Sequence, residues 1–160
     1  MPTSGRPARH GYNAYGMNVC PHLADEWSCD PMKRHILLIE DNEQNRYLAT
    51  FLLQRSGYHV EHAADGPAGV ARARQEPPAL ILLDIQLPGM DGYAVARALR
   101  ADATLLSTPI IAVTSYAMAG DREKALSAGC DGYIEKPIDP DTFVAEVSRF
   151  LPVDNVRTAP

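Results

Sequence analysis

Short apolar runs alternate with helical segments five times along this chain, and this alternation restricts the fold more than any other feature of the sequence. Apolar runs of this length, such as HILLI and PIIAV, are typical of strands that are buried on both faces. The predicted strands span residues 35–39, 58–62, 80–83, 109–113 and 133–134. Strands that alternate with helices predict a parallel sheet, because parallel neighbours need a crossover connection.

Helix signals follow each predicted strand. The first four predicted helices span residues 43–55, 67–75, 92–101 and 119–128. The last helix is expected to open with Asp139 as its N-cap and Pro140 in its first turn. The first helix is expected to turn one apolar face toward the core, and this face consists of Tyr47, Leu48, Phe51 and Leu52.

These elements predict an α/β fold, namely a doubly wound, five-stranded parallel sheet with helices on both faces. The expected strand order is the flavodoxin-like order 2-1-3-4-5, joined by right-handed crossovers. In that order the chain reverses direction across the sheet between strands one and three. Ligands bind outside the carboxyl ends of the strands at such a point, so polar residues there are candidate site residues.

The folded domain is expected to span residues 34–152, between a disordered N-terminal extension over 1–33 and a disordered tail over 153–160. The extension is rich in Gly, Pro, Asn and Ser and has no apolar period. Met32 lies immediately before the first predicted strand and is a candidate start of translation. No structural role is predicted for the residues that precede it.

Charge and composition exclude several classes of function. The net charge of −5 argues against a nucleic-acid surface, and the short stretch after Leu151 leaves no room for a recognition helix. No apolar run approaches the roughly 20 residues that cross a membrane. Cys20, His22 and Cys29 match no common zinc spacing, so no metal site is predicted there. Three cysteines in total form no even disulfide framework, which predicts a cytoplasmic protein.

Polar residues follow the predicted strands at the expected crevice. Glu40 and Asp41 follow strand one, and Asp84 follows strand three. Thr114 follows strand four, and Lys136 follows strand five. Each has a plain structural alternative: Asp41 could cap a helix and Asp84 could begin a turn. Together, three crowded carboxylates favour a hard divalent cation such as Mg²⁺, while a hydroxyl and an ammonium suit a bound phosphoryl group.

Four segments of the chain carry a resemblance to a known family. In order they read ILLIEDN, LILLDIQLPGMDG, IIAVTSYAM and GYIEKPI. They resemble the receiver domain of two-component response regulators, in the CheY-like superfamily, over about residues 34–152. They look most like single-domain regulators of the DivK type and the receivers of hybrid histidine kinases.

The resemblance implies a phosphorylation site with a metal ion. Asp84 matches the phospho-acceptor, which attacks phosphohistidine on a partner protein. Asp41 matches the direct Mg²⁺ ligand, and the backbone carbonyl of Gln86 matches the remaining protein ligand beside Asp84. Glu40 matches the carboxylate that orients a metal-bound water.

The resemblance also assigns a switch. Lys136 matches the lysine that pairs with the acceptor, and its bond to Pro137 is expected to be cis. Thr114 matches the switch hydroxyl, and Tyr133 the aromatic residue that turns inward after it. Ser115 fits the small residue that leaves room for phosphate.

Two further residues are expected to tune the lifetime of the phosphorylated state. They are Gln86, two residues after the acceptor, and Tyr116, two residues after the switch threonine. Tyr116 is expected to overhang the phosphoryl group and to hinder attacking water, which predicts a long-lived phosphoprotein.

The predicted function is that of a single-domain response regulator in a two-component system or phosphorelay, and not of an enzyme acting on other substrates. Its predicted partners are a histidine kinase or histidine phosphotransfer protein and an unidentified downstream protein, with no nucleic acid and no membrane. One alternative is a Mg²⁺-dependent aspartyl-phosphate hydrolase, although Glu40-Asp41-Asn42 replaces the Asp-x-Asp pattern of that class. Another alternative is a receiver that serves as a scaffold without being phosphorylated.

Overall fold

The sheet has five parallel strands in the order β2-β1-β3-β4-β5, which confirms the predicted topology. The computed structural model describes residues 35–115, 118 and 120–151. Its strands are β1 (His35–Ile39), β2 (His59–Ala63), β3 (Leu80–Asp84), β4 (Ile110–Thr114) and β5 (Gly132–Glu135). β1, β3 and β4 are buried along their whole length, as the continuous apolar runs predicted.

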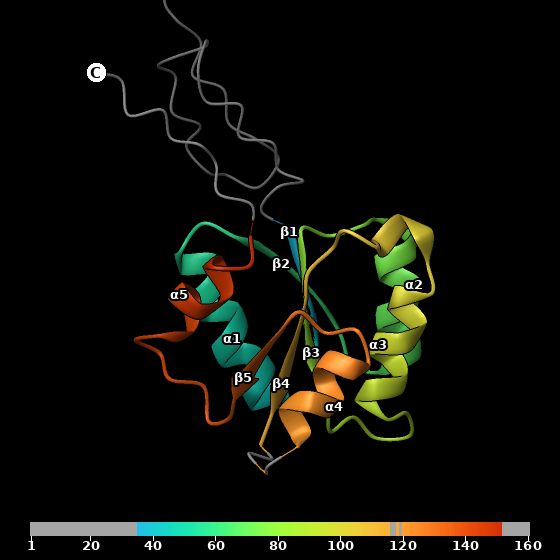
Figure 1. The fold of residues 1–160 in the computed structure, drawn as a ribbon. Helices are drawn as coiled ribbons and strands as arrows, with labels where there is room; N and C mark the ends of the chain where they lie inside the picture. Colours follow the sequence, from blue (N-terminus) through green and yellow to red (C-terminus); the bar gives the residue numbers. More distant parts are fainter. Residues whose placement is uncertain (1–34, 116–117, 119, 152–160) are drawn as a thin grey trace, which may run out of the picture.

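The helices cover both faces of the sheet, so the fold is doubly wound (Figure 1). They are α1 (Glu43–Arg55), α2 (Gly66–Gln75), α3 (Gly92–Arg100), α4 (Asp121–Ser127) and α5 (Phe143–Ser148), with a short 3-10 helix η2 (Ala103–Leu105) before β4. α1 and α5 lie on one face, and α2, α3 and α4 lie on the other. Among the described residues, no helix has the length and apolar character needed to span a membrane.

Each face of the sheet has its own apolar core. Leu37 and Ile39 of β1 point toward α2 and α3, whereas Ile36 and Leu38 point toward α1 and α5. This alternation follows from the two-residue period of a strand. Burial on both faces holds β1 and β3 rigidly, so the residues at their carboxyl ends start from fixed positions.

The inward face of α1 matches the prediction only in part, because Leu52 packs against the core and the two aromatic residues are exposed. Tyr47 and Phe51 are 72% and 48% exposed, and their rings stack on each other with centroids 6.3 Å apart. The buried residues of α1 are Ala49 and Leu53. Ala49 and Leu53 belong to the apolar core between this helix and the sheet, where side chains are closely packed.

The start of the last helix also differs from the prediction. The regular helix begins at Phe143, and Thr142 before it makes no side-chain cap. The carboxylate of Asp139 instead accepts from the backbone N–H of Asp141, and its carbonyl accepts from Phe143. Asp139 therefore closes an irregular turn ahead of α5, and the predicted cap position was wrong.

Several predictions lie outside the described residues. These are the disordered segments 1–33 and 153–160, and the role of Tyr116. The cis bond is confirmed, because Lys136–Pro137 is a cis peptide.

Candidate functional site

Three carboxylates meet where the carboxyl ends of β1 and β3 lie side by side. Glu40 and Asp41 follow β1, and Asp84 is the last residue of β3. One oxygen from each of the three lies within 4.8 Å of the others. Glu40 and Asp84 are buried and Asp41 is exposed, so the cluster opens to solvent on the Asp41 side. The structure thus brings together the residues that the sequence placed at the crevice.

Lys136 bridges the two buried carboxylates. Its Nζ donates to Oε2 of Glu40 at 2.7 Å and to Oδ2 of Asp84 at 3.0 Å. Burial alone would lower the pKa of Lys136, but these hydrogen bonds and the two negative charges raise it above its ordinary value. The lysine therefore stays charged at neutral pH and holds the two carboxylates in place.

Several opposing effects act on the pKa of Glu40. Burial raises its pKa above the usual range, and the negative charge of Asp84 raises it further. The hydrogen bond from Lys136 and its positive charge oppose that rise. Crowding of two buried acids is therefore only partly offset by one lysine, which leaves the cluster short of positive charge.

The start of α1 holds Glu40 from the other side. Oε1 of Glu40 accepts from the backbone N–H of Asn42 at 3.1 Å and from Nδ2 of Asn45 at 3.4 Å. A guanidinium N–H of Arg46 donates to the carbonyl of Glu40 at 3.4 Å. Asn42, and not Asp41, caps the helix by accepting from the N–H of Asn45. The capping alternative for Asp41 is therefore wrong.

Asp84 is oriented by the loop that follows it. Its Oδ1 accepts from the backbone N–H of Gln86 at 2.8 Å, so the turn alternative describes part of its geometry. This loop returns to the strand at Gly92, where an added Cβ would lie 2.7 Å from the carbonyl oxygen of Asp84. It would also lie 2.4 Å from Cα of Ile85, so only glycine allows this close return.

The predicted switch residues lie at the ends of β4 and β5. Thr114 is 2% exposed, and its carbonyl accepts from the N–H of Lys136, which ties the two strands together beside the site. Ser115 follows and is exposed. Tyr133 is half-buried and packs against the core that underlies α3 and α4.

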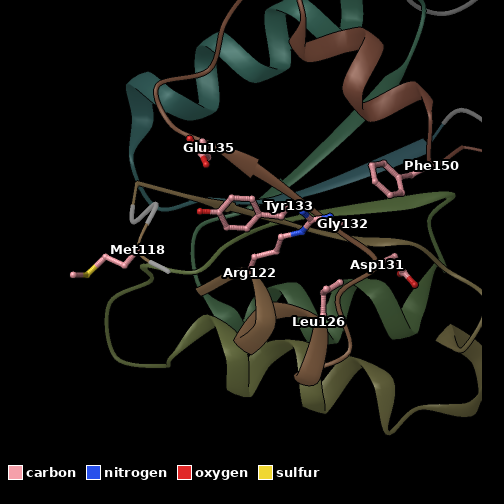
Figure 2. Close-up of a pocket in the computed structure, with 8 residues that line it drawn as sticks. All are labelled: Met118, Arg122, Leu126, Asp131, Gly132, Tyr133, Glu135 and Phe150. Carbon is pink, nitrogen blue, oxygen red and sulfur yellow. The ribbon is translucent and has the colours of Figure 1, made fainter. Parts of the chain in front are cut away.

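Tyr133 also lines a pocket of about 510 Å³ on the face of α4, β5 and the end of α5. Figure 2 shows its ring beside Arg122, with Met118 at one end of the pocket and Phe150 at the other. Gly132 also lines the pocket, and a Cβ added there would lie 2.4 Å from the ring of Phe150. The predicted switch residue Tyr133 thus lies on a hollow surface formed beside β5.

The donor set of the cluster fits a hard divalent cation. All candidate ligands are oxygens, which is what Mg²⁺ prefers. The carboxylate of Asp41 makes no hydrogen bond to any other residue in the described part of the chain, so its oxygens are available to a metal. A cation would also supply the positive charge that one lysine does not provide for three acids.

Cys130 is a poor candidate for chemistry. Its side chain is buried, and burial raises the pKa of the thiol to about 11. The reactive thiolate is therefore scarce at neutral pH.

Sequence reasoning missed three features of the site. It assigned Lys136 to the acceptor alone, and it gave neither Asn45 nor Gly92 a role in the site. The only signal for Asn45 was its place in the first turn of the helix that follows Glu40, and that position does not specify a partner.

Comparison with known proteins agrees with this geometry. Residues 36–148 match the response regulator receiver domain family. The polar-differentiation response regulator DivK of Brucella ovis is 39% identical over 120 residues, which cover 75% of this chain and 98% of DivK. The DivK protein of Brucella anthropi matches to the same extent.

Solved structures give the same result. The chemotaxis response regulator CheY4 of Vibrio cholerae matches with a TM-score of 0.70 and 29% identity, over 73% of this chain and 98% of CheY4. The receiver domain of the sensor histidine kinase PA1611 from Pseudomonas aeruginosa matches with a TM-score of 0.69 and 37% identity, over 74% of this chain and 97% of that receiver. That structure has a magnesium ion coordinated in its active-site cleft. The chain of 160 residues described here belongs to the family of response regulator receiver domains, with the CheY-like fold.

Proposed function

We propose that this receiver is a single-domain response regulator whose Asp84 accepts a phosphoryl group from phosphohistidine in a Mg²⁺-dependent reaction. The observation that carries the proposal is that Asp84 pairs with Lys136 and lies within 4.8 Å of the carboxylates that follow β1. The DivK relatives support the single-domain assignment, since they match over 98% of their own length.

The chain's own residues account for the transfer. An oxygen of Asp84 attacks phosphorus, a P–O bond forms, and the P–N bond breaks with its electron pair going to the imidazole of the donor. The backbone N–H of Gln86 fixes Oδ1, while Lys136 lies at Oδ2, where its charge offsets the charge of the transferred group. Positioning and charge neutralisation are the main requirements of phosphoryl transfer.

The metal would be held by Asp41, Asp84 and the carbonyl of Gln86, with Glu40 acting through a water molecule. When bound, Mg²⁺ supplies positive charge to the phosphoryl oxygens. The magnesium ion in the PA1611 receiver supports this assignment, and so do the oxygen donors of the cluster here.

We further propose that Thr114 and Tyr133 transmit the phosphorylation state. Phosphate on Asp84 would draw the Thr114 hydroxyl toward it, and the ring of Tyr133 would move into the space behind. The pocket that Tyr133 lines would then change shape, and a partner protein could favour one form. Gln86 and Tyr116 are proposed to set the lifetime of the phosphate, and the cytoplasm is the proposed location.

A small phosphodonor tests the reaction without knowledge of the partner. Incubation with acetyl phosphate and Mg²⁺ should add one phosphoryl group that is stable in acid and labile in base, as seen by intact-protein mass. Chelation of the metal should prevent the gain. An unmodified protein under all conditions would favour the scaffold alternative, and continuous release of inorganic phosphate from unrelated phosphate esters would favour the hydrolase alternative.

The phosphodonor class can then be tested by phosphotransfer profiling. Purified histidine kinases and histidine phosphotransfer proteins of the host are labelled and mixed with this chain for short times. Rapid transfer from one donor in preference to the others would identify its partner.

A further inference from the structure

Glu40 is held more completely than any other carboxylate of the site. Its Oε1 accepts two hydrogen bonds from the first turn of α1, and its Oε2 accepts one from Lys136. The two oxygens therefore have different surroundings: Oε1 faces the helix, and Oε2 faces Asp84 across the ammonium of Lys136. Because both oxygens belong to one planar carboxylate, the groups that hold Oε1 also determine the position of Oε2.

The two donors to Oε1 are of different kinds. Asn42 supplies a backbone N–H, which any residue except proline would supply at that position. Asn45 supplies its side-chain amide, so this contact depends on the residue type. The amide of Asn45 is not needed to start the helix, because the side chain of Asn42 caps it through the backbone N–H of Asn45.

Local helix stability does not account for asparagine at this position. Asparagine is a weaker helix former than alanine, and position 45 lies within α1. The Asn45 side chain is partly buried, and among the described residues its one side-chain hydrogen bond goes to Glu40. The contact with the site is therefore the physical feature that distinguishes asparagine here.

We propose that Asn45 is a positioning residue of the metal site. Its amide holds Oε1 of Glu40 and thereby presents Oε2 to the space shared with Asp84 and Lys136. The inference rests on the proposed function, since it takes the carboxylate cluster to be the Mg²⁺ site. Outer groups that orient metal-binding carboxylates raise affinity because the ligand is already placed before the metal arrives.

The test is a titration of the full chain with MgCl₂ alone, followed by amide chemical shifts. Asn45→Ala removes the donor, and Asn45→Leu removes it while keeping most of the side-chain volume. The Mg²⁺ dissociation constant should rise about three- to ten-fold in both variants, near or below the low end of effects known for such outer groups. Gln44→Ala is the matched control, because Gln44 is an exposed neighbour on the same helix. It should bind Mg²⁺ as the wild type does.

Stability separates positioning from a general structural role. The metal-free melting temperature of Asn45→Ala should equal or exceed that of the wild type, because alanine is the better helix former. A lower melting temperature together with weaker binding in both variants would indicate a structural role and would contradict the proposal.

A double-mutant cycle tests the route of the effect. In a Glu40→Ala background, Asn45→Ala should cause no further loss of Mg²⁺ affinity. A loss that persists there, or wild-type affinity in both Asn45 single variants, overturns the inference and leaves the proposed function intact. A wild-type protein that binds no Mg²⁺ overturns the metal site and the inference with it.

Discussion

The two ends of β1 both carry ionisable groups, but they are built very differently. At the carboxyl end, the carboxylate of Glu40 is 4% exposed, and Lys136 joins it to Asp84 through hydrogen bonds of 2.7 and 3.0 Å. Both oxygens of Glu40 and both oxygens of Asp84 have a donor. This end is a buried charge cluster in which each oxygen of the two buried acids has a hydrogen-bond partner.

At the amino end, the contacts are longer and more exposed. The buried ring of His35 lies 3.5 Å from a carboxylate oxygen of Glu61, and Arg72 reaches Glu61 only at 3.8 Å. The ring of His59 meets that of His35 edge-on, with centroids 5.3 Å apart. Neither ring nitrogen of His35 has a hydrogen-bond partner in the described part of the chain.

This difference between the two ends of β1 indicates that the functional site lies at the carboxyl end. Buried ion pairs are often no more stabilising than apolar residues of the same size, so two buried acids that share one lysine at the end of a strand point to function. A loosely paired group at the opposite end of the same strand has no such organisation. We therefore expect substitutions at the two ends to have very different consequences.

The largest effect is expected for Lys136→Met. This change keeps the aliphatic stem but leaves two buried carboxylates without their shared cation, which should lower the free energy of unfolding by about 3 kcal/mol at neutral pH without metal. Since the pKa of Lys136 is raised in the folded state, its contribution to the free energy of unfolding is complete at neutral pH and is lost as the pH rises through that raised value. The difference in free energy of unfolding between the wild type and Lys136→Met should therefore become smaller in strongly alkaline solution, as measured by urea denaturation.

Mg²⁺ provides a second comparison for the same variant. Removing a cation from the cluster should leave Mg²⁺ affinity equal to that of the wild type or tighter. Weaker binding in Lys136→Met would contradict the electrostatic description of the site.

A smaller effect is expected for Asp41→Ala. Asp41 is exposed and makes no described hydrogen bond, so its loss should change the metal-free stability little. It removes one proposed metal ligand, however, and the Mg²⁺ dissociation constant should rise about ten-fold or more, which equals at least about 1.4 kcal/mol. Calorimetric titration with MgCl₂ measures this directly, and an unchanged dissociation constant would remove Asp41 from the ligand set.

The smallest effect is expected for His35→Leu at the amino end. The substitution removes no described hydrogen bond, because neither ring nitrogen of His35 has a partner there, and leucine fills a similar volume. The free energy of unfolding should therefore change by less than about 1 kcal/mol. Mg²⁺ affinity and phosphorylation should be unchanged. A clear loss of Mg²⁺ affinity or of phosphorylation would mean that the two ends of β1 are coupled, which would contradict the difference expected between them.

How much of this could be predicted from sequence depends on the range of the interaction. β1 matched its predicted bounds because a strand buried on both faces must be apolar throughout. On α1 the spacing identified Tyr47 and Phe51 as one face, but Ala49 and Leu53 have the same spacing. Periodicity defines the faces of a helix, and close packing selects which of them the core accepts.

The site shows the same limit. The order of strands placed Glu40, Asp84 and Lys136 at one edge, because carboxyl ends of parallel strands coincide there. One oxygen of Glu40 accepts from Lys136 and the other from Asn45. This choice of partners depends on side-chain geometry, which no spacing in the sequence encodes.

The central claim is that Asp84 is the residue that carries the phosphoryl group. Its most direct test is intact-protein mass and peptide mapping after treatment with acetyl phosphate and Mg²⁺, on the wild type, Asp84→Asn and Asp91→Asn. Asp91 is the matched control, because it caps α3 through its side chain and asparagine caps equally well. We expect one phosphoryl group on Asp84 in the wild type and in Asp91→Asn, and none in Asp84→Asn. Labelling that survives Asp84→Asn, or that maps to Asp91, would contradict the account.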